Sequence, residues 1–217
     1  MELRRRVRGP LDAVEPSAAF ADGLKRRWRR DQLGDGTLWQ CNLIDAPLPR
    51  SAYDLIFARW VFLFLPNPAA HVKKLVAALK PGGRLAVEDY SRWTLRMVPE
   101  PPEWENFLKA DGAFFETQGG DVNIGARLPQ LYTQAGLDVV DITPTTKFGR
   151  PGNAEWTWMT TYFLGMLPRY AALRPFTPTQ AASLRRHWLA CAARKTSLLV
   201  SPTVLDVVGR KTSTRAL

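Results

Sequence analysis

The stretch LKPGGRLAVEDY (79–90) decides the fold class, because it joins the end of one predicted element to the start of another. Residues 69–80 carry apolar side chains at helical spacing, and the Pro-Gly-Gly triplet that follows breaks this pattern. The next residues, RLAVEDY, have the apolar composition of a strand and end on two acids, Glu88 and Asp89. The stretch therefore predicts a helix that leads through a tight turn into a strand.

The regions on both sides of this stretch extend the same alternation. YDLIFARW (53–60) is a largely apolar run that predicts a strand buried on both faces. Strand, helix and strand in quick succession indicate βαβ units and a parallel sheet, so the predicted class is α/β. The remaining predicted strands are residues 11–15, 37–43, 137–143 and 203–211, the remaining predicted helices are residues 16–32, 124–135, 154–172 and 178–195, and residues 92–120 are predicted to be an irregular insertion.

The composition is that of a folded protein with a basic surface. The chain has 217 residues, of which 46% are hydrophobic and 23% charged, and its net charge is +10. Its two cysteines, Cys41 and Cys191, provide neither a disulfide framework nor a metal-ligand cluster. The N-terminus has no apolar run typical of a signal peptide, and no stretch approaches the roughly 20 apolar residues of a membrane helix. These features predict a cytoplasmic protein without a membrane segment.

The positive charge is concentrated near the start of the chain. Nine of the thirty basic residues fall within the first thirty positions. Such a region is either the solvated face of a helix or a patch that attracts phosphate backbones. No aromatic stacking motif accompanies the charge, which favours the solvated face over a nucleic-acid-binding module.

Several segments, taken in order, resemble class I S-adenosylmethionine-dependent methyltransferases. The resemblance covers most of residues 10–145 together with 197–211. Its central part is the pair DLIFAR and LKPGGRL with the spacing between them, and the flanking segments agree in order. The segments are DAVEPS (12–17), WQCNLIDAPLP (39–49), DLIFAR (54–59), LPNP (65–68), LKPGGRL (79–85), VED (87–89) and VVGRK (207–211).

The resemblance implies one domain with a Rossmann-like sheet in the strand order 3-2-1-4-5-7-6. The core would comprise residues 10–91, 121–145 and 197–211, with residues 92–120 as an insertion. Residues 150–196 would form a helical embellishment before the last strand, on the substrate side. The implied activity is methyl transfer from S-adenosyl-L-methionine to a small-molecule acceptor.

The resemblance also implies a set of cofactor-binding residues. Glu15 follows the second strand of the family, where a carboxylate accepts hydrogen bonds from both ribose hydroxyls. Asn42 and Leu43 fall where the family contacts adenine, and Ala58 and Arg59 fall beside the methionine moiety. Each polar side chain has a structural alternative: Glu15 as an acid before a helix, Asn42 as a turn residue and Arg59 as a surface cation.

The substrate side is implied by the end of the fifth strand and by the helical embellishment. Glu88, Asp89 and Tyr90 end that strand, where the acceptor would lie. Either acid could act as a base, but hydrogen bonding within the fold is the favoured role for both. Trp158 and Tyr162 would form a wall of the substrate site or pack in the core. No catalytic base and no metal ligand is assigned, since methyl transfer needs a base only when the nucleophile arrives protonated.

The family's first strand and its glycine-rich loop have no counterpart in these 217 residues. Without that strand, its two neighbours must pair directly or leave their edges open. Without the loop, the chain is expected to bind S-adenosylmethionine weakly or not at all. Three interpretations stay open: an enzyme whose missing segment is encoded upstream, an inactive remnant, or a methyltransferase-like binding protein.

Overall fold

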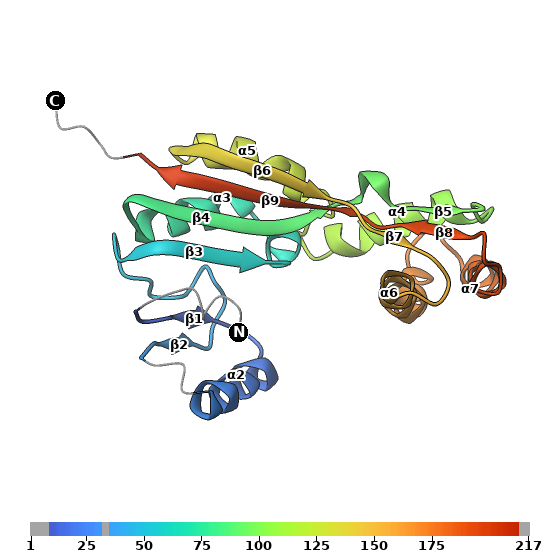
Figure 1. Cartoon of the computed structure of the whole chain (residues 1–217), viewed down its shortest axis with the longest axis horizontal. Coiled ribbons are helices and arrows are strands. Elements are labelled where there is room, and N and C mark those ends of the chain that lie inside the picture. Colours follow the sequence, from blue (N-terminus) through green and yellow to red (C-terminus); the bar gives the residue numbers. More distant parts are fainter. Residues whose placement is uncertain (1–8, 32–34, 213–217) are drawn as a thin grey trace. The chain divides into compact units, whose positions relative to one another are not determined.

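The computed structural model describes residues 9–31 and 35–212. The protein divides into two compact units, Met1–Ala52 and Tyr53–Leu217 (Figure 1). Among the residues described, the shorter unit contains one helix and a pair of short strands, and the longer unit contains the main sheet and the other helices.

In the first unit, the strands form a parallel pair on either side of the helix in sequence. Strand β1 (Ala13–Val14) pairs with β2 (Leu38–Trp39), and α2 (Ala18–Arg30) lies between them along the chain. Ser17 is the N-cap of α2, and its side chain accepts a hydrogen bond from the Phe20 N–H at 3.5 Å. The predicted strand, helix and strand are therefore present, although both strands are shorter than the apolar runs that predicted them.

The second unit is built on a four-stranded sheet in the order β3-β4-β9-β6. Strand β3 runs parallel to β4, whereas β9 runs antiparallel to both of its neighbours. This order is that of the last four strands implied by the family, 4-5-7-6, and it confirms the α/β Rossmann-like class. The strands are β3 (Tyr53–Arg59), β4 (Leu79–Ser91), β6 (Leu137–Thr145) and β9 (Thr203–Lys211).

Two helices cover one face of this sheet. Helix α3 (Pro68–Ala78) packs on β4 after a short 3-10 turn, and α5 (Ile124–Gln134) packs on β4, β6 and β9. The approach of α5 is close because Gly125 faces β4: a Cβ at this position would lie 2.7 Å from the Asp89 carbonyl oxygen. Any side chain at Gly125 would therefore push α5 away from the sheet.

A second, smaller sheet and three helices lie past the carboxyl end of β4 (Figure 1). This sheet has the order β5-β8-β7 and is antiparallel throughout. Its elements are η2 (Arg92–Thr94), β5 (Arg96–Val98), α4 (Trp104–Glu116), β7 (Phe148–Gly149), α6 (Ala154–Tyr170), α7 (Pro178–Ala192) and β8 (Leu198–Val200).

The core of this helical layer is aromatic, and Phe107 of α4 lies at its centre. Its ring centroid lies within 6.4 Å of five other aromatic rings. Aromatic pairs of this kind add to the free energy gained by burial alone. The five rings are those of Trp104, Phe163, Tyr170, Phe176 and Trp188.

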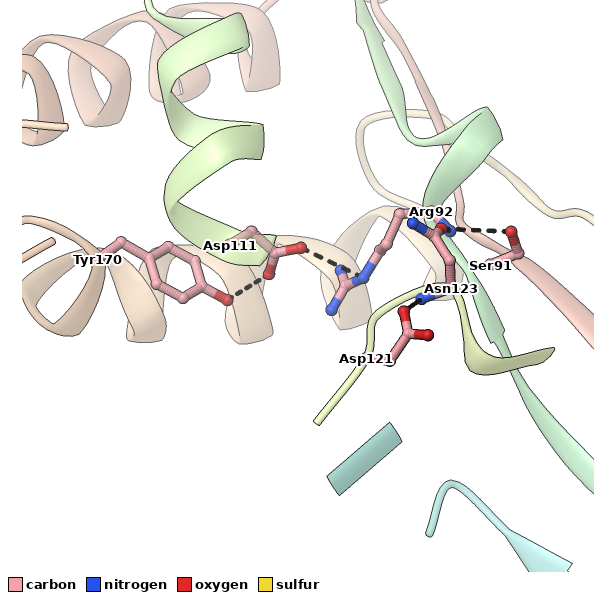
Figure 2. A network of polar contacts seen from close by, with 6 residues as sticks. All are labelled: Ser91, Arg92, Asp111, Asp121, Asn123 and Tyr170. Atoms are coloured by element: carbon pink, nitrogen blue, oxygen red, sulfur yellow. Dashed lines mark hydrogen bonds and ion pairs between the residues drawn. The ribbon is translucent and has the colours of Figure 1, made fainter. Parts of the chain in front are cut away.

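A buried ion pair connects the end of β4 with this layer (Figure 2). Arg92 Nε lies 3.3 Å from Asp111 Oδ2, and the two side chains are only 9% and 1% exposed. The Tyr170 hydroxyl donates a hydrogen bond of 2.6 Å to the other oxygen of Asp111. One carboxylate therefore connects η2, α4 and α6.

Asn123, next to α5, secures the backbone at the same point. Its Oδ1 accepts hydrogen bonds from the Arg92 N–H at 2.9 Å and from the Ser91 hydroxyl at 3.4 Å (Figure 2). The Asn123 N–H in turn donates to Asp121 at 2.8 Å. The chain direction after β4 is therefore set by side chains on the segment that leads into α5.

The prediction of an irregular insertion at residues 92–120 is wrong in one respect, because α4 occupies Trp104–Glu116. The prolines that suggested irregular structure all precede Trp104, so they do not interrupt the helix. Phe107 and Phe115 recur on its buried face. The helical pattern was present but lay close behind the proline-rich stretch.

The prediction that residues 53–60 are buried on both faces is also wrong. Strand β3 pairs only with β4 among the described residues, and Leu55 and Phe57 are each 42% exposed. Among the described residues, β1 pairs only with β2.

No helix within residues 9–31 and 35–212 combines the length and apolar character needed to cross a bilayer.

Replacing Asp111 with Ala should lower the free energy of unfolding by about 3–5 kcal/mol, because the Arg92 charge would stay buried without its partner. Chemical denaturation followed by circular dichroism measures this. The matched control is Glu105→Ala on the same helix, whose ion pair with Lys109 is exposed and should leave the denaturation midpoint nearly unchanged. Equal midpoint shifts in the two variants would contradict the prediction.

Candidate functional site

Arg59 and Glu88 lie opposite each other where the parallel strands β3 and β4 end. Arg59 Nε and Glu88 Oε1 form an ion pair of 2.8 Å. The next residue, Trp60, donates its backbone N–H to the Glu88 carbonyl oxygen at 2.9 Å. Ligands of open α/β sheets bind beyond the carboxyl ends of the strands, so this is the expected place for a site.

Trp60 has an unusual backbone conformation at this position. Its φ is 54°, in the left-handed region, which costs a bulky residue about 1–3 kcal/mol. The conformation places the indole parallel to the rings of Tyr90 and Trp158, at centroid distances of 5.5 and 6.3 Å. The Arg59 guanidinium lies 4.1 Å from the Trp60 ring centroid. Stacked rings and a stacked cation thus offset the backbone strain.

A cavity of about 480 Å³ opens beside this stack. Its sheet side is formed by Arg59, Glu88 and Asp206, and its helix side by Glu155 and Trp158. Glu88 and Asp206 are direct cross-strand partners on β4 and β9, so their side chains share one face. The volume falls in the range typical of small-molecule sites.

The helix side of the cavity is positioned by the first turn of α6. Asn153 is the N-cap, and its side chain accepts a hydrogen bond of 2.9 Å from the Trp156 N–H. This cap fixes where α6 begins and hence where Glu155 and Trp158 project. Trp158 is 41% exposed, unlike the buried Trp156 two residues earlier.

Asp89 does not line the cavity, because successive residues of β4 point to opposite faces. It is fully buried and accepts hydrogen bonds from the N–H groups of Leu63 at 3.2 Å and Tyr90 at 2.9 Å. Burial raises the pKa of Asp89 to about 6, although the backbone N–H groups oppose this shift. The carboxylate therefore fixes the turn after β3.

Tyr90 and Tyr162 lie near the cavity without lining it. Tyr90 stacks on Trp60, and burial raises the pKa of its hydroxyl. Tyr162 is 36% exposed and packs edge-on against Phe163 at 5.0 Å. Both rings also lie within 6 Å of the Arg92 guanidinium. The structure thus brings these two predicted residues to one cation behind the cavity wall.

The predicted cofactor residues Glu15, Asn42 and Leu43 belong to the first unit. Glu15 directly follows β1 and is half-buried, and its Oε1 accepts a hydrogen bond of 2.8 Å from the Ser17 N–H. This bond leaves acceptor capacity on the carboxylate for a diol. Asn42 is exposed, and its side-chain amide lies 3.5 Å from Asp45 Oδ2. Leu43 is half-buried.

The last predicted cofactor residues, Ala58 and Arg59, point to opposite faces of the sheet. Ala58 is in register with Val87, whose side chain is buried, and Arg59 with Glu88 at the cavity. Among the residues that the structure describes, no group of three or more side chains is arranged to bind a metal ion.

The sequence analysis gave no site role to most of the cavity-lining residues, and Trp60 and Asp206 matter most among those. Trp60 ends the apolar run of β3, and its place next to Arg59 was an available signal. Asp206 is the acid within VLDVV, an otherwise apolar strand, and an isolated acid in such a strand is a signal too. Its role depends on pairing with β4, which the local sequence does not specify.

Comparison with known proteins agrees with this architecture. Residues 2–87 match the family described as "Methyltransferase domain". The match spans 86 of the 217 residues and ends within β4. This confirms the resemblance found in the sequence. Comparison with curated proteins gives no significant match.

Solved structures show that the methyltransferase fold extends over nearly the whole chain. A candidate methyltransferase from Bacillus halodurans is 12% identical, with a TM-score of 0.62 over 94% of this chain and 84% of that one. Geranyl diphosphate C-methyltransferase from Streptomyces coelicolor, solved with S-adenosyl-L-homocysteine, is 16% identical, with a TM-score of 0.54 over 96% and 65%. The [4+2]-cyclase SpnF is 14% identical, with a TM-score of 0.57 over 97% and 69%. At these identities the likeness concerns the fold alone.

The Asp89 carboxyl should make stability depend on pH. Its pKa is about 6 in the folded protein and ordinary in the unfolded chain, so the folded state holds the proton more tightly. The protonated Asp89 carboxyl contributes about 3 kcal/mol to the free energy of unfolding below about pH 4. This contribution is lost as the pH rises through 6. Urea unfolding at several pH values should show the free energy of unfolding of the wild type falling by about 3 kcal/mol relative to that of Asp89→Asn over this range.

The control for this measurement is Asp54→Asn, which changes a carboxylate that is exposed and paired with Lys80. Its stability difference from the wild type should show no comparable dependence on pH. A difference between wild type and Asp89→Asn that stays constant from pH 4 to 7 would contradict the assignment.

Proposed function

We propose that this protein transfers the methyl group of S-adenosyl-L-methionine to a small-molecule acceptor. The observation that carries the proposal is the cavity at the carboxyl ends of β3 and β4, lined by Trp60 and Trp158. The family match over residues 2–87 supports methyl transfer rather than a basic nucleic-acid-binding module. A cytoplasmic location remains a prediction from the sequence.

The residues proposed to hold the cofactor are those that the family resemblance implies. Glu15 would accept hydrogen bonds from the ribose hydroxyls, and the Asn42 carbonyl oxygen would accept one from the adenine amino group, beside Leu43. Ala58 and Arg59 would lie by the methionine part. Arg59 has five N–H donors, so its ion pair with Glu88 leaves donors for a carboxylate.

The cofactor would supply an electrophilic methyl group on a sulfonium, and the protein would align the acceptor with it. Direct displacement depends mainly on this alignment, because holding two reactants in line removes much of the entropic barrier. Glu88 and Trp158 line the cavity and would contact the acceptor. The other predicted substrate residues would act indirectly. Tyr90 would hold Trp60 in place, Tyr162 would support the cavity wall, and Asp89 would hold the turn after β3.

Cofactor binding by the 217-residue chain is expected to be weak, because its sequence has no G-x-G-x-G loop to approach the methionine part. Calorimetric titration with S-adenosyl-L-homocysteine should give a dissociation constant above roughly 100 μM, which corresponds to less than about 5.5 kcal/mol of binding free energy. A micromolar or tighter constant would contradict the expected impairment. No specific binding at millimolar concentration would contradict the proposed function itself.

Glu15→Gln should weaken this binding roughly tenfold or more, because hydrogen bonds to a charged acceptor contribute about 1.5–3 kcal/mol. Ligand-detected NMR can follow such weak binding. Asp22→Asn is the matched control, since Asp22 lies on α2 and forms an exposed pair with Lys25. Equal affinities of the two variants for S-adenosyl-L-homocysteine would remove Glu15 from the cofactor site.

A further inference from the structure

The cavity carries more negative than positive charge. Three carboxylates line it, those of Glu88, Glu155 and Asp206, against two cations, Arg59 and Lys147. The Arg59 charge is already matched by Glu88 at 2.8 Å. Glu155 lies in the first turn of α6, where the helix dipole favours an acid. Among the three carboxylates, Asp206 is the one that has neither an ion-pair partner nor the start of a helix beside it.

The surroundings of Asp206 explain why its charge is unmatched. It lies between Glu88 on β4 and Thr143 on β6 in the sheet register. Asp206 forms no ion pair with any residue in the described ranges 9–31 and 35–212. Burial and the nearby Asp141 carboxylate raise the pKa of Asp206, while the Arg59 charge lowers it. A cation placed beside Asp206 would relieve this repulsion.

The aromatic wall of the same cavity is suited to a cation as well. The indole of Trp158 is 41% exposed and parallel to that of Trp60. Indole faces attract cations more strongly than other aromatic rings do. The fold already uses this property, because the Arg59 guanidinium stacks on Trp60 at 4.1 Å. An exposed indole and an unmatched carboxylate thus line one small cavity.

We propose that this cavity binds a small organic cation, a protonated amine on a compact apolar group, with its charge beside Asp206 and its body against Trp158. The proposal rests on the proposed function in one respect: the bound amine would be the methyl acceptor. Its nitrogen would first lose its proton to solvent water and then bond to the methyl carbon as the sulfur–methyl bond breaks, which leaves S-adenosyl-L-homocysteine. Binding itself needs no cofactor. An anion in the place of the amine would instead meet Glu88, Glu155 and Asp206, whereas the remaining Arg59 donors would face the methionine part of the cofactor.

Three probes that share one ring and differ in charge test this proposal: benzylamine, benzyl alcohol and benzoate at pH 7.5. Saturation-transfer NMR on the full chain without cofactor should rank benzylamine first, roughly tenfold tighter than benzoate. Asp206→Asn should remove most of this preference. Trp158→Leu should weaken the binding of benzylamine and of benzyl alcohol, because both would lose the indole that packs against their ring. The matched control is Asp138→Asn, which changes an exposed acid of β6 paired with Arg210 and should leave the ranking intact.

The outcomes separate this proposal from the proposed function. Benzoate binding as tightly as benzylamine, or an unchanged preference in folded Asp206→Asn, would overturn the cation site. Should Asp206→Asn fail to fold by circular dichroism, Glu155→Gln, which removes a second lining acid, is expected to reduce the preference instead. Benzylamine binding without any binding of S-adenosyl-L-homocysteine would leave the cation site standing and overturn methyl transfer. Cofactor binding without a charge preference would overturn the cation site alone.

Discussion

Strand β4 is hydrogen-bonded along both edges, to β3 and to β9, and its two-residue period decides which side chains reach the cavity. Glu88 points to the cavity and Asp89 to the face under α5. A slip of one residue would bury the Glu88 charge and expose Asp89. The register is held from the helix side as well, because Gly125 lets α5 lie directly on the backbone of β4. The register of β4 thus decides how α5 packs, how deeply Asp89 is buried and where Glu88 meets the cavity.

Local sequence patterns were sufficient for most elements, since helical spacing and apolar runs are local properties. The helices α5 and α6 and the strands β6 and β9 lie where these patterns predicted them. Burial is not local. Whether β3 has one partner or two depends on residues far away in sequence, so the exposure of Phe57 could not be read from its apolar neighbours. In α4 the helical signal was present, but the prolines before Trp104 obscured it.

The candidate site shows the same division. The resemblance placed Glu88 and Trp158 near the acceptor, and both line the cavity. It could not identify Asp206, because only the antiparallel register of β9 places that residue opposite Glu88. The left-handed conformation of Trp60 likewise arises from the stacking of rings on β4 and α6, which no local pattern encodes. The sequence could supply candidate positions, whereas the contacts between them depend on the register of the folded sheet.

The fold alone does not determine the reaction, since a [4+2]-cyclase shares it at a TM-score of 0.57. What distinguishes one chain from another is the segment that closes the cavity, and in this protein that segment is α6. Tyr170, at the far end of α6, is bonded to Asp111, and Asp111 is paired with Arg92 just after β4. A buried pair of this kind adds little net stability over apolar side chains of the same size. Its geometric effect is larger, because it ties the helix that carries Trp158 to the strand that carries Glu88.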